Sequence, residues 1–394
     1  MTTAARATVI RGISHLVTND PSAGPGLLGI LRNAAVVISD GVISWIGPDR
    51  DAPAADDAVD AGGRAALPGW VDSHTHLVFA GDRAAEFTAR MAGVQYRAGG
   101  MAATVAATRA TDDETLLALV RQRLGRMRAG GTTCVETKTG YGLTIDEELR
   151  HASIAVQAGV DEVTFLGAHV VPEEFDKDRE GYVDLVCGPM LDAVLPQVRW
   201  IDVFCETGAF DDAESRRVLS AGQRAGLGMR LHGNQLGAGS GVKLAVDMGA
   251  ASVDHCTYLS EDDVRALAGG DTVATLLPAT DLSTRQPPAP GRTLADAGVP
   301  LALATNCNPG TSYTTSMPLV VALAVMQCGL TVPEAVHAAT AGGAQALRRD
   351  DVGVLRPGAR ADLQIIDAPT VDHIAYRIGG AGVHAVWQRG QRVV

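Results

Sequence analysis

The sequence lacks the features that mark secreted and membrane proteins. Its 6 cysteines are scattered and include no Cys-x-x-Cys pair, which predicts reduced thiols rather than a disulfide framework. No stretch approaches the roughly 18 uncharged apolar residues of a transmembrane helix. The first residues, Met-Thr-Thr-Ala-Ala-Arg, are not followed by the continuous apolar segment of a signal peptide. We therefore expect a cytoplasmic protein.

Long runs of like charge are also absent. The net charge of −12 is spread along the chain, which argues against a surface for nucleic acid or anionic membranes. The 394 residues are 46% hydrophobic and 20% charged, as is usual for soluble globular proteins. This length predicts one large domain with a substantial core and one smaller domain.

Both ends of the chain are rich in candidate β-strands. The N-terminal candidates are 7–13, 33–38 and 42–46, and the C-terminal ones are 361–366, 383–388 and 391–394. Asp40-Gly41 and Arg389-Gly390 are turn sequences between such strands. We predict one small β-sandwich domain built from residues 1–66 and 354–394. The alternative is two independent β-rich additions to a larger domain.

The intervening residues 67–353 alternate between strand and helix patterns. The clearest helices are predicted at 113–129, 145–157 and 212–225. This alternation predicts a parallel sheet, and eight candidate strands favour a closed (β/α)8 barrel over an open sheet. The candidate strands are 70–79, 132–137, 163–169, 200–205, 229–232, 252–255, 272–277 and 301–305.

The first of these strands carries two histidines. His74 and His76 are two residues apart, so both imidazoles point to the same face of an extended chain. Two neutral imidazoles on one face form half of a site for zinc or iron. The alternative is a pair that only forms hydrogen bonds. Matching polar residues later in the chain favour the metal.

Polar residues close most of the other candidate strands. In a barrel, the C-terminal ends of the strands gather at one mouth, where active sites lie. The residues at these ends are Glu136, Lys138, His169, Glu206, His232, His255 and Asn306. The other histidines are assigned structural or surface roles, and they are His15, His151, His337, His373 and His384.

Several longer segments resemble a known family. Residues 68–76, Pro-Gly-Trp-Val-Asp-Ser-His-Thr-His, are similar to the metal-binding opening of the amidohydrolase superfamily. Residues 76–87, 136–143, 164–169 and 308–311 together resemble the imidazolonepropionase family. The similarity runs from about residue 30 to the C-terminus. The His-x-His pair alone indicates no particular substrate, whereas the combined set does.

The resemblance implies hydrolysis of the ring amide of 4-imidazolone-5-propanoate to N-formimidoyl-L-glutamate in histidine breakdown. It implies a barrel beside a β-sandwich, in a cytoplasmic homodimer that holds one metal ion per chain, Zn²⁺ or alternatively Fe³⁺. The implied metal ligands are His74, His76, His232 and Asn306. The implied substrate contacts are Arg83, Tyr141, His169, Gln235, Asn308, Gly310 and Thr311, and Gln235 and His255 match the polar pair beside the attacking water.

Physical chemistry supports several of these roles. Arg83 follows the metal-binding strand directly, and its guanidinium suits the propionate carboxylate. Tyr141 lies between Gly140 and Gly142, on a loop that could close over a substrate. His255 can carry a proton because imidazole titrates near neutrality. The structural alternatives are a surface salt bridge for Arg83 and a packed loop aromatic for Tyr141.

Asn306 departs from the family pattern, which has an aspartate at this position. An asparagine carbonyl can still contact a metal, but the side chain cannot act as a general base. The sequence therefore leaves three functions open. They are the hydrolase itself, a related hydrolase or deaminase acting on another cyclic amide or amidine, and a slowed or inactive variant that binds the ligand.

Overall fold

The computed structural model describes residues 6–93 and 100–394, which divide into two compact units. Of the described residues, the first unit contains those up to Asp72, Gly125–Cys134 and Ser316–Val394. The second unit contains those of Ser73–Leu124 and Val135–Thr315. Residues 1–5, where no signal-peptide pattern was found, lie outside the described part of the chain.

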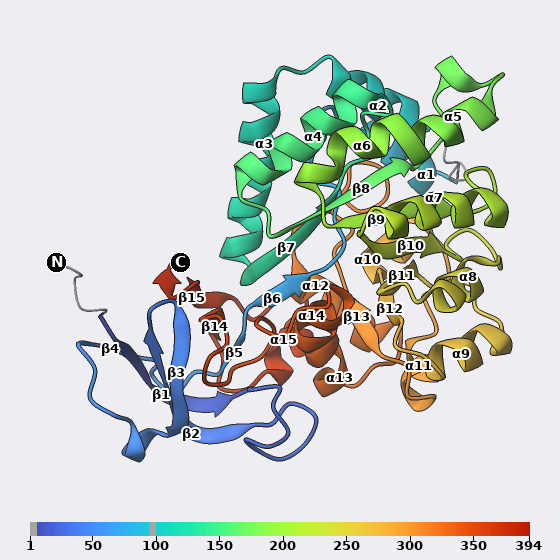
Figure 1. The fold of residues 1–394 in the computed structure, drawn as a ribbon. Coiled ribbons are helices and arrows are strands. Elements are labelled where there is room, and N and C mark those ends of the chain that lie inside the picture. Colours follow the sequence, from blue (N-terminus) through green and yellow to red (C-terminus); the bar gives the residue numbers. More distant parts are fainter. Residues whose placement is uncertain (1–5, 94–99) are drawn as a thin grey trace. The chain divides into compact units, whose positions relative to one another are not determined.

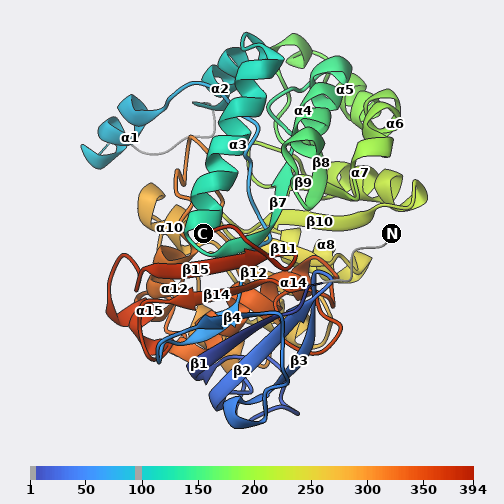
Figure 2. The same ribbon diagram turned by 90° about the vertical axis from the view of Figure 1, so that its left-hand side faces the viewer.

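The first unit contains a sheet made from both ends of the chain (Figure 2). Its strand order is β16-β15-β14-β5-β1-β2-β3, β4 also pairs with β1, and most neighbours are antiparallel. The N- and C-terminal candidate strands therefore belong to one sheet, whereas the domain boundaries at 66 and 354 stay a prediction. The strands are β1 (Thr8–Leu16), β2 (Leu31–Ser39), β3 (Val42–Pro48), β4 (Asp57–Asp60), β5 (Ala66–Pro68), β14 (Leu363–Ile366), β15 (Val383–Gln388) and β16 (Gln391–Arg392).

Two predicted turns connect neighbouring strands of this sheet. Asp40 and Gly41, with φ of 53° and 78°, join β2 to β3. Arg389 and Gly390, with φ of 52° and 77°, join β15 to β16. Positive φ at both central residues is the type I′ geometry, whose twist matches that of paired strands. Glycine at the second position adopts it without steric cost.

Eight parallel strands form a nearly closed barrel, as predicted. They follow one another in chain order from β6 to β13. Every residue of β7, β8 and β9 is buried, as expected for parallel strands covered on both faces. The strands are β6 (Trp70–Asp72), β7 (Thr132–Lys138), β8 (Glu162–Ala168), β9 (Trp200–Cys205), β10 (Gly228–Gly233), β11 (Ser252–His255), β12 (Val273–Leu276) and β13 (Leu301–Leu303).

The first barrel strand is shorter than predicted, because β6 ends at Asp72 rather than at Phe79. Side chains hold the backbone that follows. The amide of Leu77 donates to Thr137 Oγ1 at 2.8 Å, and Arg123 donates to the carbonyls of Leu77 and Phe79 at 2.7 and 2.9 Å. These contacts replace a regular strand ladder.

The segment after β6 nevertheless lies beside the segment after β13. The amide of His76 donates to the carbonyl of Cys307, and the amide of Asn306 donates to the carbonyl of His74, each at 3.0 Å. Thr75 and Cys307 form an isolated parallel bridge. The two ends of the strand series therefore meet at the residues that carry the candidate metal ligands.

Helices connect the strands, and α4 to α9 lie outside β8 to β12 in Figure 1. Asp211 and Glu214 form a capping box at the start of α7, as does the Thr331–Glu334 pair at α13. No helix among the described residues is both long and apolar enough to cross a membrane. The helices are α1 (Ala84–Met91), α2 (Met101–Arg109), α3 (Asp113–Ala129), α4 (Ile145–Ala158), α5 (Arg179–Leu185), α6 (Leu191–Val194), α7 (Asp212–Arg224), α8 (Gly241–Met248), α9 (Glu261–Ala268), α10 (Pro278–Thr284), α11 (Gly291–Asp296), α12 (Met317–Met326), α13 (Val332–His337), α14 (Gly343–Ala346) and α15 (Asp372–Tyr376).

Candidate metal and substrate site

A single cleft in the second unit gathers most of the residues predicted to be functional. Their side chains come from segments that follow different barrel strands, as the strand-end pattern predicted. Two predicted residues are not part of this lining but lie next to residues that are: the ring of His74 is 4.5 Å from that of His232, and Gly310 packs against Arg83. The lining residues are His76, Arg83, Met101, Tyr141, His169, Phe204, His232, Gln235, His255, Asn306, Asn308 and Thr311.

Two buried carboxylates orient two of the histidines. Nδ1 of His74 lies 2.6 Å from Asp254, and Nδ1 of His232 lies 3.0 Å from Asp202. Nε2 of each ring has no hydrogen-bond partner in the described part of the protein. A carboxylate at Nδ1 fixes the tautomer whose Nε2 lone pair is open, which is the usual arrangement of metal-binding histidines.

Two further histidines, His76 and His255, lie near this pair. The ring centroid of His76 is 5.3 Å from that of His74 and 5.6 Å from that of His232. Among the residues that the structure describes, however, the group whose ring nitrogens lie within 4.8 Å of one another is His74, His232 and His255. Two of the three predicted histidine ligands therefore belong to this group, and His255 takes the place of His76, whose ring lies beside those of His74 and His232.

Burial keeps His74, His76 and His255 in their neutral form. It is the largest cause that holds the pKa of His74, His76 and His255 well below the usual value. Burial is also the largest cause that lowers the pKa of His169 to about 3. Neutral imidazole is the form that binds a metal.

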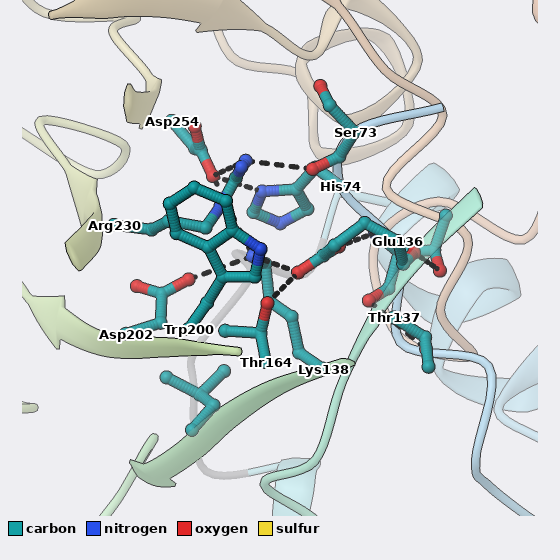
Figure 3. Close-up of polar contacts among 12 residues, drawn as sticks. Ser73, His74, Glu136, Thr137, Lys138, Thr164, Trp200, Asp202, Arg230 and Asp254 are labelled. Carbon is teal, nitrogen blue, oxygen red and sulfur yellow. Dashed lines mark hydrogen bonds and ion pairs between the residues drawn. The ribbon is translucent and has the colours of Figure 1, made fainter. Parts of the chain in front are cut away.

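Behind the histidines lies a buried network of charged residues (Figure 3). Lys138 Nζ lies 2.9 Å from both Glu136 and Asp202 and 3.8 Å from Asp254. Arg230 contacts Asp254 at 3.2 Å. Burial opposes ionisation of Asp254, but Arg230 and the other positive neighbours hold its pKa well below the usual range. The two carboxylates that orient His74 and His232 are therefore ionised and held in place.

Asn306 faces the same histidines. Its φ of 50° lies in the left-handed region, which asparagine tolerates better than most residues. Its Nδ2 donates to Thr280 Oγ1 at 2.9 Å, which leaves Oδ1 without a hydrogen-bond partner within the described chain. The carbonyl oxygen, the one atom that could contact a metal, is thus the atom left open.

Arg83 is not a surface residue, since only 6% of its side chain is exposed. Its Nε and Nη2 donate to the two carboxylate oxygens of Glu86 at 2.8 and 2.7 Å. A Cβ on Gly310 would lie 2.2 Å from Arg83 Nη1, so a side chain at Gly310 would displace the guanidinium. Glu86 and Gly310 therefore fix the position of this cation at the cleft.

The Asn308–Thr311 segment is a tight loop held by one side chain. Asn308 Oδ1 accepts from the amides of Gly310 and Thr311, both at 2.8 Å. Asn308 Nδ2 donates to the carbonyl of Asn306 at 2.6 Å and to Thr311 Oγ1 at 2.9 Å. Asn308 thus couples this loop to the candidate metal site.

The remaining predicted residues are also buried at the cleft. The ring of Tyr141 lies 5.5 Å from that of His169, which stacks on His76 at 5.3 Å between centroids. The backbone amide of Gln235 donates to the carboxylate of Glu206 at 2.8 Å. Glu206 therefore shapes the loop that carries Gln235.

Sequence analysis missed the residues that support the site from behind, chiefly Asp202, Asp254 and Arg230. Met101 and Phe204 of the cleft lining were missed as well. The available signal was a charged residue inside an otherwise apolar strand, as in Trp-Ile-Asp-Val-Phe and Ser-Val-Asp-His. Such residues are rarely buried unless they are paired.

The fold agrees with the comparison to known families. Residues 80–394 match the model of the amidohydrolase family. The chain belongs to the amidohydrolase family.

Highly similar relatives narrow the assignment within that family. Three of them are imidazolonepropionases with nearly full-length similarity, which makes the chain a hydrolase of the imidazolonepropionase group. The protein of Saccharopolyspora erythraea is 62% identical over 98% of this chain and 99% of the relative. That of Salinispora arenicola is 58% identical over 97% of each chain, and that of Mycolicibacterium smegmatis is 56% identical over 98% and 97%.

Solved structures share the fold at much lower identity. A triazine hydrolase variant is 19% identical, with a TM-score of 0.75 over 98% of this chain and 94% of that one. An adenosine deaminase from Xanthomonas campestris with bound zinc is 21% identical, with a TM-score of 0.71 over 98% and 92%. Similarity at this level concerns the fold alone.

Proposed function

We propose that this cleft hydrolyses the ring amide of 4-imidazolone-5-propanoate to N-formimidoyl-L-glutamate, as expected for a hydrolase of histidine degradation. The observation that carries the proposal is that candidate metal-binding nitrogens and a group able to bind a carboxylate lie together at one cleft. The lining holds His232, whose Nε2 is open, and the fixed guanidinium of Arg83. The ring of His74, whose Nε2 is also open, lies 4.5 Å from that of His232. A cyclic amide with a carboxylate tail needs both.

We further propose that His74, His76, His232 and Asn306 hold one ion, zinc or alternatively iron. The open nitrogens of His74 and His232 and the open Oδ1 of Asn306 support this donor set. Two structural neighbours, an atrazine chlorohydrolase mutant from Arthrobacter aurescens and an adenosine deaminase, are described with zinc. A bound ion supplies Lewis acidity and lowers the pKa of water towards neutrality.

The other residues bind substrate and move protons. Arg83 holds the propionate carboxylate, and Tyr141, His169, Asn308, Gly310 and Thr311 contact the rest of the substrate. His255 and Gln235 flank the reacting amide, where neutral His255 accepts a proton and returns it to the leaving nitrogen. We also propose that the enzyme acts as a homodimer in the cytoplasm.

The decisive experiment measures turnover of 4-imidazolone-5-propanoate and metal content on the same sample. We expect product formation without ammonia release, together with one metal ion per chain. Released ammonia from an amidine would favour the deaminase alternative. An anomalous-scattering map without metal near His74, His76 and His232, in protein never exposed to chelator, would refute the ligand assignment.

A further inference from the structure

Glu148 is a buried carboxylate that the proposed reaction does not use. It lies in the first turn of α4 (Ile145–Ala158) and is fully buried. Its Oε1 accepts from the amides of Gly142 and Leu143, both at 2.8 Å, and its Oε2 accepts from the amide of Gly140 at 3.0 Å. The carboxylate thus binds the backbone on both sides of Tyr141.

The loop that Glu148 binds has a conformation that needs such support. Gly140 has φ of 104° and Leu143 has φ of 57°, which is unfavourable for a side chain larger than glycine. A Cβ on Gly142 would lie 2.7 Å from the backbone nitrogen of Glu148, so the loop packs directly against the start of α4. An anionic side chain at a helix N-terminus also interacts favourably with the helix dipole.

The same loop contains one candidate substrate contact, Tyr141, and binds another, His169. Tyr141 lies within it, and only 3% of this residue is exposed. The carbonyl of Gly140 accepts a hydrogen bond from Nδ1 of His169 at 2.9 Å. Burial raises the pKa of Glu148, whereas hydrogen bonds from Thr139 and the three loop amides oppose that rise.

We infer that Glu148 is a positioning residue of the enzyme, which holds the 139–143 loop so that the hydroxyl of Tyr141 meets the substrate. This inference rests on the proposed function, because it takes Tyr141 to be a substrate contact. Displacement of a positioned group by about 1 Å can cost on the order of 100-fold in rate. Glu148 therefore acts on catalysis without touching the substrate.

The test is Glu148→Gln, which keeps the side-chain shape but places an amide NH2 against backbone donors. We expect kcat/KM to fall by about 10- to 100-fold with metal content unchanged. Glu162→Gln is the matched control. Glu162 is also buried, but it lies at the start of β8, at the end away from His169, and accepts hydrogen bonds from Trp200 and Arg199. The control should retain parental kinetics.

A second background separates positioning from a general loss of structure. In Tyr141→Phe, Glu148→Gln should lower kcat/KM by clearly less than it does in the parent, because the hydroxyl to be positioned is gone and only the contact between Gly140 and His169 is still affected. Gly142→Ala displaces the loop without changing the carboxylate and should reproduce the loss, which keeps the test valid if Glu148→Gln does not fold. Parental kinetics in Glu148→Gln, or an undiminished loss in Tyr141→Phe, would overturn the inference. Absence of turnover in the parent chain would instead refute the proposed function.

Discussion

We expect Asn306 to limit the rate of this enzyme. Its carbonyl oxygen faces the candidate metal ligands, but its amide cannot take a proton near neutral pH. The neighbouring His255 is the other base in the cleft, and burial lowers its pKa, so it is a weaker proton acceptor than a free imidazole. The retained substrate-contact residues favour a slowed hydrolase over one that has lost its activity.

The variant Asn306→Asp tests this interpretation. Loss of a general base costs about 10²–10⁴-fold in rate, so restoring the carboxylate should raise kcat by at least about tenfold. It should also strengthen metal retention, since an anionic oxygen replaces a neutral one. Steady-state kinetics with metal analysis provide the measurement. If the parent chain already turns over at ordinary enzyme speed and the variant is no faster, His255 takes the proton.

Arg83 should contribute mainly to substrate affinity. Arg83→Ala should raise KM by an amount equivalent to roughly 1.5–3 kcal/mol, the cost of a lost charge-assisted contact. Metal content should not change. Because Arg83 also binds Glu86, the control is Glu86→Gln, which loosens the guanidinium without removing it. Equal KM values for Arg83→Ala and the parent would assign Arg83 to structure alone.

At the scale of elements, β7 carries the lysine at the centre of a buried charged network. Lys138 at its end is fully buried and contacts three carboxylates, of which Asp202 and Asp254 orient His232 and His74. Removing one partner of a buried ion pair leaves uncompensated charge. The network therefore couples folding of the barrel to the geometry of the metal site.

Lys138→Met should reveal that coupling. We expect a loss of about 3–5 kcal/mol in the free energy of unfolding, together with weaker metal retention against a chelator. The double variant Glu136→Gln/Lys138→Met should recover part of both, because one excess negative charge is removed. Lys243→Met is the control, since Lys243 pairs with Asp247 on the exposed face of α8. Urea titration at fixed pH measures the free energy of unfolding. An equal loss in Lys138→Met and in the control Lys243→Met would argue against the network.

Helix α4 contributes a histidine that should make the protein sensitive to acid. Burial, aided by Arg150 and Arg109, lowers the pKa of His151 from 6.5 to about 3. Between pH 6.5 and pH 3, His151 is therefore protonated in the unfolded chain but not in the folded protein. Stability from this group is complete above pH 6.5 and falls by up to about 1.4 kcal/mol per pH unit until pH 3.

Replacement of His151 by leucine should remove this contribution. The free energy of unfolding of His151→Leu should decline less steeply than that of the parent between pH 6.5 and 5, while the two should have similar slopes above pH 7. Denaturant titrations at several pH values give the comparison. Identical slopes in the acid range would mean that His151 is protonated in the folded protein.

At the scale of the whole molecule, the two ends of the chain depend on each other. β14 pairs with β5 and β15, and β5 pairs with β1, so the C-terminal strands extend the N-terminal sheet. Their core is shared as well, since Ile10, Ile13 and Val36 lie in one cluster with Leu363 and Trp387. The first 66 residues cannot bury that face without the tail.

Deletion of residues 354–394 should therefore destabilise the N-terminal strands too. We expect increased proteolysis within residues 6–66 and loss of solubility, because exposed strand edges and apolar faces promote aggregation. Proteolysis followed by mass spectrometry would locate the cleavages. A truncated chain with parental solubility and protection would show that the domain boundaries at 66 and 354 are wrong.

The sequence by itself determined the barrel, the sheet from both termini and the group of polar strand ends. Those predictions rest on local periodicity, since each apolar run specifies a strand and each strand end in a barrel meets the others. The two hairpin turns followed from Asp40-Gly41 and Arg389-Gly390 for the same reason. Family resemblance then supplied the candidate roles of residues such as Arg83 and Asn308.

Only the tertiary structure decided which groups support those residues. Asp202, Asp254 and Lys138 come from three different strands and meet in one network. No spacing in the sequence reports such contacts, because burial and partners depend on how distant segments pack. The early end of β6 has the same cause, since side chains from Thr137 and Arg123 replace strand partners there. Local patterns place side chains on elements, whereas long-range packing sets their charges and their partners.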